Sequence, residues 1–130
     1  LVVGSGNIVH NLRAVNASLG DDGYDWARRF DEEVSEQLLS QPGDAVALGS
    51  HRHYRDAAPT PDHFIPMLYF AGLASEASMR VRSIAHGYVY GSISMAAYGL
   101  GVENLGQEDQ LHQGACATPP LEVPADESNI

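Results

Sequence analysis

The sequence contains no lysine, so seven arginines supply all of its fixed positive charge against seventeen Asp and Glu residues, and the formal net charge is −10. Proteins bind nucleic acids through clusters of Lys and Arg that neutralise phosphates, and we therefore expect no nucleic-acid partner. An anionic membrane surface would repel a protein of this charge, so we expect no membrane partner either.

Cysteine is also scarce: Cys116 is the only one, which excludes an intramolecular disulfide and a cysteine-rich zinc site. No run of eighteen apolar residues could span a membrane, and we expect no signal peptide. The 130 residues, of which 44% are hydrophobic and 18% charged, predict a soluble globular domain in the cytoplasm. The start on a strand-like segment without Met suggests part of a longer polypeptide.

The order of apolar segments predicts an α/β fold in which strands alternate with helices around a central sheet. Residues 1–3 predict a buried strand, and helices are predicted over 7–15, 24–40 and 61–74. Two strands joined near Gly87, or one strand and a longer β segment, are predicted to follow.

The composition changes near residue 101. We expect one folded domain over residues 1–101, because the apolar periodicity ends there. Residues 102–130 hold six acidic residues and no Lys or Arg. This acidic segment predicts a disordered tail.

The stretch "PTPDHFIPMLY", residues 59–69, predicts a rigid helix start that carries chemistry. Thr60 suits the N-cap, and the proline after it suits the first helical position. Asp62 and His63 then lie at the positive end of the helix dipole, which favours a carboxylate and keeps an imidazole neutral. Pro66 cannot donate to the carbonyl of Asp62, so we expect a kink or a free acceptor there.

Among the histidines, His10 and His63 lie where chemistry is expected: His10 follows the predicted strand and turn of residues 2–7, and His63 lies at the helix start. Together they indicate a metal or acid–base site. The alternatives are a capping or packing role for His10 and a surface position for His63. His51 and His53 form an H-x-H pair that we interpret as solvated loop residues.

Two glycine-containing motifs are incomplete in this sequence. The third glycine of a dinucleotide fingerprint is replaced by Val9, and a nucleophile elbow around Ser5 has Val3 and Asn7 in place of its glycines. A hydrolase built on a histidine therefore lacks a convincing nucleophile.

Three stretches in order, "GSGNIVHNLRAV" (4–15), the 59–69 helix start and "GYVYGSISMAAY" (87–98), resemble the C-terminal half of the class III extradiol ring-cleavage dioxygenases. The branch they resemble most is the 4,5-DOPA dioxygenase type, and the resemblance covers about residues 1–101. It implies an α/β fold and a mononuclear non-haem metal, Fe(II) in the active enzyme, with Zn(II) possible in the same position. It also implies catechol-type substrates opened with O2.

The resemblance implies that His63 is a metal ligand and that His10 is an acid–base catalytic group or an extra ligand. Asp62 is the nearest carboxylate and a backup ligand. Three further residues could line the site: Asn7, Tyr90 and Ser92.

The family's N-terminal half supplies two further metal-site histidines, and neither of their motifs occurs in this chain. The chain is therefore interpreted as a fragment, as a subunit that needs a missing N-terminal half or a homo-oligomer, or as an inactive remnant. The alternative function is a non-catalytic metal-binding or interaction module on the same fold.

Overall fold

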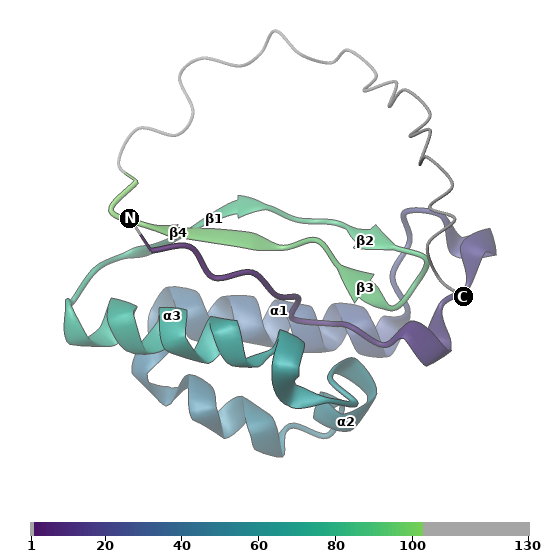
Figure 1. Cartoon of the computed structure of the whole chain (residues 1–130), viewed down its shortest axis with the longest axis horizontal. Helices are drawn as coiled ribbons and strands as arrows, with labels where there is room; N and C mark the ends of the chain where they lie inside the picture. The colour runs from purple at the N-terminus through teal and green to yellow at the C-terminus, as the bar shows by residue number, and fades with distance from the viewer. Residues whose placement is uncertain (1, 103–130) are drawn as a thin grey trace, which may run out of the picture.

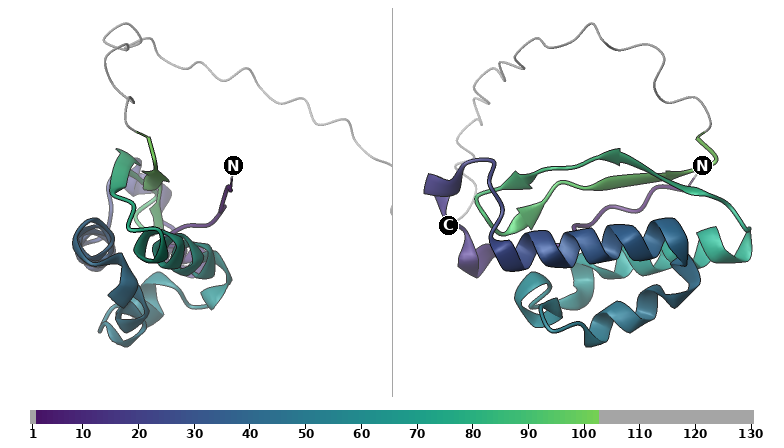
Figure 2. Two further views of the ribbon diagram at one scale, coloured as in Figure 1. Left: turned by 90° about the vertical axis from the view of Figure 1, so that its left-hand side faces the viewer. Right: turned by 180° about the vertical axis from the view of Figure 1, so that it is seen from behind.

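The computed structural model describes residues 2–102. Helices α1 (Asp25–Ser40) and α3 (Ile65–Glu76) lie side by side beneath a β-ribbon, and a further helical layer lies below them (Figures 1 and 2). This lower layer consists of the 3-10 helix η3 (Pro42–Ser50) and the short helix α2 (Tyr54–Ala57). The mixed α/β class is confirmed, and within the described range all strands follow the helices in sequence.

The ribbon consists of two successive antiparallel strand pairs. Strand β1 (Val81–Ala85) pairs with β4 (Ala97–Leu100), and β2 (Tyr88–Val89) pairs with β3 (Ile93–Ser94). The chain reverses at Tyr90 and Gly91, which have φ values of 53° and 85°. The prediction of a reversal near Gly87 was therefore wrong by a few residues, because the segment continues through a second pair of strands.

The start of the chain forms neither the strand nor the helix predicted for it. Residues 2 and 3 form no strand, and Val2 and Val3 are 80% and 79% exposed. The helix predicted over 7–15 is also wrong: His10 forms a β-bridge with Ile93, and only short 3-10 turns follow. These turns are η1 (Leu12–Ala14) and η2 (Ala17–Leu19).

Two asparagines explain why these turns replace a helix. The side chain of Asn11 accepts a hydrogen bond from the backbone of Arg13, and that of Asn16 accepts one from Ser18. Asparagine side chains that bind the backbone two residues later favour turns over a continuous helix.

The helix predicted over 24–40 is confirmed as α1. Phe30, Val34 and Leu38 on its inner face are fully buried, and Phe64 and Val9 join them in the core. This core holds the two segments that carry His10 and His63.

The helix predicted over 61–74 is divided in two. Pro61–His63 form a 3-10 turn, η4, and α3 begins at Ile65. Thr60 is at the cap position but makes no side-chain capping hydrogen bond. Pro66 lies in the first two positions of α3, where a helix leaves its N–H groups unpaired, and the interruption of the helix falls directly before it.

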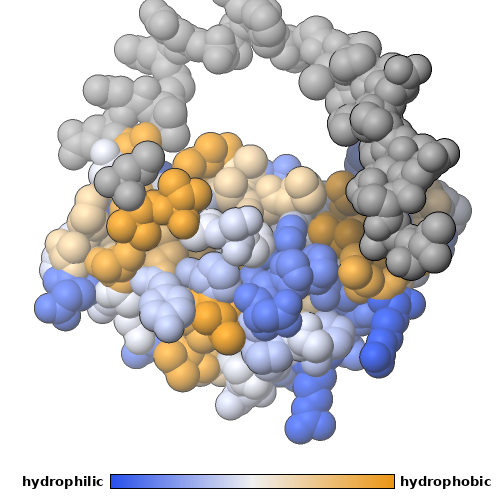
Figure 3. Space-filling model, viewed as in Figure 1, coloured by the Kyte–Doolittle hydropathy of each residue, from blue (hydrophilic) through white to orange (hydrophobic). Residues whose placement is uncertain are grey.

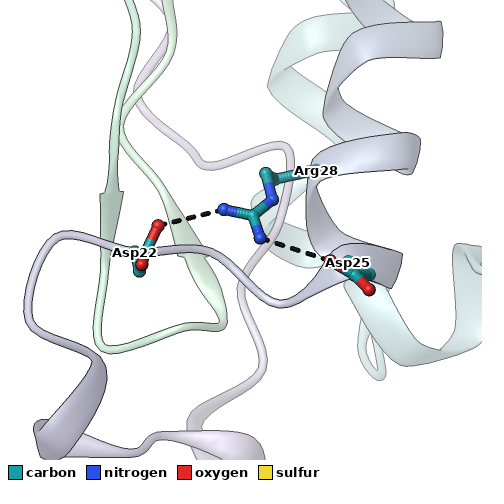
Figure 4. A network of polar contacts seen from close by, with 3 residues as sticks. All are labelled: Asp22, Asp25 and Arg28. Carbon is teal, nitrogen blue, oxygen red and sulfur yellow. Dashed lines mark hydrogen bonds and ion pairs between the residues drawn. The ribbon is translucent and has the colours of Figure 1, made fainter.

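An exposed polar network holds the loop before α1 (Figure 4). Arg28 donates to the carboxylate of Asp22 at 3.0 Å and to that of Asp25 at 3.2 Å. Both carboxylates raise the pKa of Arg28, and its hydrogen bond to Asp25 contributes most. Asp25 also lies in the first turn of α1, where the helix dipole favours an acid.

Between residues 2 and 102 the structure has no helix with the length and apolar character that a membrane span requires. The predicted tail over 102–130 lies outside the described residues except for Val102, as do His112 and Cys116.

Candidate functional site

His10 and His63, which are far apart in sequence, stack against each other in the structure. Their ring centroids are 3.6 Å apart and the ring planes are inclined by 22°. The two histidines that the sequence assigns to one site therefore lie in contact with each other.

Backbone hydrogen bonds to two neighbouring segments hold His10. Its N–H donates to the carbonyl of Ala57 at 2.7 Å, and its bridge to Ile93 joins it to the ribbon. The neighbouring carbonyl of Val9 accepts from the N–H of Ser94 at 2.9 Å. His10 therefore lies between strand β3 and the end of α2.

A close backbone approach positions His63. The N–H of Asn7 donates to the carbonyl of His63 at 3.0 Å. Gly6 lies so close that a Cβ atom there would overlap the same carbonyl oxygen. Phe64, the next residue, is only 1% exposed and anchors the turn in the core.

The electrostatic surroundings of His10 favour its neutral form. Burial lowers the pKa of His10, and the adjacent His63 lowers it further, while Asp62 acts in the opposite direction. Hydrogen bonding from Thr60 and from the backbone lowers the pKa of Asp62, so this carboxylate stays ionised, with Oδ2 3.4 Å from Nε2 of His63. A neutral imidazole can bind a metal or accept a proton.

The donor set fits part of a metal site. Imidazole and carboxylate are the ligands typical of non-haem iron. However, ring nitrogens bind a metal in the ring plane, and two planes stacked this closely do not converge on one ion. Residues 2–102 contain no group of three His, Cys, Asp or Glu side chains that could hold a metal ion. One imidazole of the stacked pair could therefore be a metal ligand, while the other lies beside it without binding the same ion.

The three other candidate residues have different surroundings. The side-chain amide of Asn7 donates to the carbonyl of Ser94 at 2.8 Å. Ser92 is fully buried, and its hydroxyl donates to the carbonyl of Asn11 at 2.8 Å. Tyr90 is 44% exposed at the tip of the ribbon. Asn7 and Ser92 thus hold the backbone on both sides of His10.

His51 and His53 lie in the loop between η3 and α2, as predicted, but the prediction that their side chains are solvated was wrong. The side chain of His51 is 13% exposed; its Nε2 lies 3.0 Å from Glu33, and its ring packs against Phe30. The side chain of His53 is 22% exposed, and its Nδ1 lies 3.8 Å from Asp56. Both pack against the helices rather than project into solvent.

A buried carboxylate, missed from the sequence, supports the segment around His10. Asp31 is 4% exposed and accepts hydrogen bonds from Ser94 Oγ at 2.7 Å and from the hydroxyl of Tyr88 at 3.0 Å. The backbone of Ser94 in turn binds Asn7 and Val9. A continuous set of hydrogen bonds therefore runs from α1 to the residues beside His10.

The helical spacing contains a signal for this residue. Asp31 lies four residues after Ala27 and three before Val34, so it belongs to the buried face of α1. An acid on an apolar face indicates a buried polar network. Its neighbours His86 and Tyr88 line a surface hollow beside it.

Gly6→Ala is expected to lower the free energy of unfolding by about 1–3 kcal/mol, because the added methyl group overlaps the carbonyl of His63 and must displace backbone. Urea denaturation of the full chain measures this loss. Gly72→Ala is the matched control: Gly72 lies inside α3 with open space around its Cα, so the substitution should stabilise by up to about 1 kcal/mol. Equal stability of Gly6→Ala and the native chain would contradict the close approach.

The family model described as the catalytic LigB subunit of aromatic ring-opening dioxygenase matches residues 1–101. The chain is 33% identical over 105 residues to the 4,5-DOPA dioxygenase extradiol of Escherichia coli strain K12, covering 78% of this chain and 38% of that protein. It is also similar to the crystal structure of an uncharacterized protein from Escherichia coli K12, with a TM-score of 0.61 and 32% identity over 72% of this chain and 40% of that one. The chain thus spans about two-fifths of the length of each.

Proposed function

The chain belongs to the family of the catalytic LigB subunit of aromatic ring-opening dioxygenase, and from this premise we propose that it supplies one part of a non-haem metal site in an extradiol-type dioxygenase. The observation that carries the proposal is the stacked His10–His63 pair. It unites the two residues that the family resemblance assigns to the metal centre.

We assign different roles to the two imidazoles because both cannot face one ion in this geometry. His63, beside the ionised Asp62, is the metal ligand, and Asp62 is a backup ligand. His10, whose pKa is lowered, is the acid–base group: its neutral ring can take a proton from a substrate hydroxyl and return it later. When bound, Fe(II) would supply adjacent positions for a catecholate and O2.

The substrate we propose is a small catechol-type aromatic compound, with O2 as the second reactant. The similarity to a 4,5-DOPA dioxygenase extradiol supports this class. We propose Fe(II) as the active metal, Zn(II) as an ion that the same donors could hold, and the cytoplasm as the location. The remaining ligands would come from a part of the protein that these 130 residues do not span.

The test is an anaerobic Fe(II) titration of the full chain, followed by O2 uptake with catechol. It is performed alone and together with the part of the Escherichia coli relative that lies outside the match. We expect weak Fe(II) binding by the chain alone, and one tightly bound Fe(II) with O2 uptake in the assembled protein. His63→Ala should abolish both, and His10→Ala should reduce O2 uptake more than Fe(II) affinity.

His53→Ala is the matched control, because His53 lies outside the stacked pair and should leave both measurements unchanged. Fe(II) binding and O2 uptake that are insensitive to His63→Ala would contradict the proposal. Metal binding without O2 uptake would favour the alternative, a non-catalytic metal-binding module.

A further inference from the structure

Ser94, on strand β3, connects the backbone segments of both stacked histidines. Its N–H donates to the carbonyl of Val9 at 2.9 Å, directly before His10. Its carbonyl accepts from the side-chain amide of Asn7 at 2.8 Å. The backbone N–H of Asn7 donates in turn to the carbonyl of His63 at 3.0 Å. Ser94 is therefore one residue away from each histidine along these hydrogen bonds.

The side chain of Ser94 binds Asp31. Its Oγ donates to Oδ1 of Asp31 at 2.7 Å and accepts from the N–H of Ala96 at 3.3 Å. A hydrogen bond from a hydroxyl to a carboxylate is roughly twice as strong as one between neutral groups. The other oxygen of Asp31, Oδ2, accepts from the hydroxyl of Tyr88 at 3.0 Å. Asp31 thus fixes the side chain of Ser94, while the backbone of Ser94 binds the two histidine segments.

The burial of Asp31 costs free energy that packing alone does not require. Charged side chains normally lie at the surface, as hydrophilic residues do on the face in Figure 3, whereas Asp31 and Ser94 are 4% and 1% exposed. An apolar residue on the inner face of α1 would hold the ribbon without the desolvation of a carboxylate. It would not fix the orientation of the Ser94 hydroxyl, because that requires a directional hydrogen bond.

We propose that Asp31 is a positioning residue for the stacked histidine pair. It acts through Ser94 and Asn7, so a shift of Ser94 moves the backbone of both histidines and changes the distance and inclination of their rings. This inference rests on the proposed function, in which His10 must meet a substrate proton while His63 holds the metal. A misplacement of about 1 Å can lower the rate of such a step about 100-fold.

The alternative is that Asp31 only attaches the ribbon to α1. Tyr88 and Ser94 distinguish the two roles, because each donates one hydroxyl hydrogen bond to Asp31 but Ser94 also binds the histidine segments. Tyr88→Phe keeps the ring that lies against Gly23 and removes the hydroxyl alone. It is therefore the matched control for Ser94→Ala, which also removes one hydroxyl that donates to Asp31.

The experiment records NMR spectra of the full chain without metal or substrate and measures nuclear Overhauser contacts between the rings of the two histidines. We expect these contacts in the native chain, and we expect Ser94→Ala and Asp31→Ala to weaken them. Tyr88→Phe should preserve them, and so should Asp31→Asn, because the amide oxygen of asparagine still accepts from Ser94. Asn7→Asp should weaken them too, since it keeps the shape of the side chain but removes the donor to the Ser94 carbonyl.

Leu38→Ala is the control for a general loss of stability, because Leu38 is fully buried on α1 but takes no part in these hydrogen bonds. It should unfold at a lower urea concentration and still keep the ring contacts. Ring contacts that are missing in the native chain, that survive Ser94→Ala, Asp31→Ala and Asn7→Asp, or that Leu38→Ala loses equally would overturn the proposal.

Kinetics of the protein assembled with the unmatched part of the Escherichia coli relative provide the second measurement. Ser94→Ala should lower kcat about 10- to 100-fold and change KM by less than about twofold, because it displaces the histidines without removing a group that binds substrate. An equal loss of kcat in Tyr88→Phe would contradict the positioning role. Ring contacts that depend on Ser94 in a protein that consumes no O2 would count against the proposed function alone.

Discussion

Phe64→Ala is expected to lower the free energy of unfolding by about 3–5 kcal/mol, because it removes a ring from the centre of the core. Phe64 is 1% exposed, and its ring lies 5.8 Å from that of Phe30 and 5.2 Å from that of Tyr54, the latter edge to face. Small domains are stable by only about 5–15 kcal/mol, so this loss is a large part of the total.

The substitution should also affect the candidate site, because Phe64 directly follows His63. Without the ring, the 3-10 turn loses its anchor and the stacked imidazoles can separate. Urea denaturation measures the stability, and the ring proton shifts of His10 and His63 in NMR spectra report the stacking.

Tyr69→Ala is the matched control for Phe64→Ala, since it removes a similar ring that is 74% exposed. It should change the free energy of unfolding of the chain alone by less than about 0.5 kcal/mol. If both variants lose the same stability, Phe64 is not the anchor of the turn. If Phe64→Ala is unstable but the histidine shifts are unchanged, the turn holds His63 by other means.

The sequence was informative where local rules dominate. The four-residue spacing of apolar side chains predicted α1, and the proline-rich start of the third helix correctly placed His63 near the helix terminus. The motif resemblance brought His10 and His63 together before any geometry was known. Each of these inferences depends on residues that are close in sequence or on a recognisable pattern.

Elements that depend on distant partners could not be predicted in this way. Val2 and Val3 have the composition of a buried strand, yet a strand needs a neighbour, and residues 2–102 provide none. Turns formed in place of the helix expected over 7–15, because the side chains of two asparagines accept hydrogen bonds from nearby backbone N–H groups. The valines are therefore exposed because no strand within residues 2–102 pairs with them, and the asparagines form turns because their side chains bind backbone groups two residues later.

Asp31→Ala is expected to cost about 2–4 kcal/mol, because Ser94 would lose the acceptor for a buried hydroxyl and Tyr88 the acceptor for a partly buried one. The effect should extend to His10, since Ser94 also binds Asn7 and Val9 through its backbone. Urea denaturation measures the loss. The exposed loop residue Asp21 provides the control, and Asp21→Ala should change stability by less than about 0.5 kcal/mol.

The pH dependence of Asp31→Asn separates the charge of Asp31 from its hydrogen bonds. Burial raises the pKa of Asp31 above its ordinary value of 3.8, although the bonds from Ser94 and Tyr88 lower it; nearby, His86 lowers it and Glu32 raises it. A raised carboxyl pKa means that the native state holds the proton more tightly than the unfolded state. The resulting stabilisation is complete below the ordinary pKa and is lost as the pH rises through the raised value.

The asparagine variant carries no titrating proton at this position and should lack this loss. The difference in unfolding free energy between the native chain and Asp31→Asn should therefore move in favour of the variant over the pH range that begins at the ordinary pKa of 3.8 and extends through the raised value. Parallel stability curves over this range would show that burial does not penalise the Asp31 carboxylate. In that case the hydrogen bonds from Ser94 and Tyr88 would fully offset its desolvation, and the carboxylate would hold the backbone beside His10 at no cost in stability.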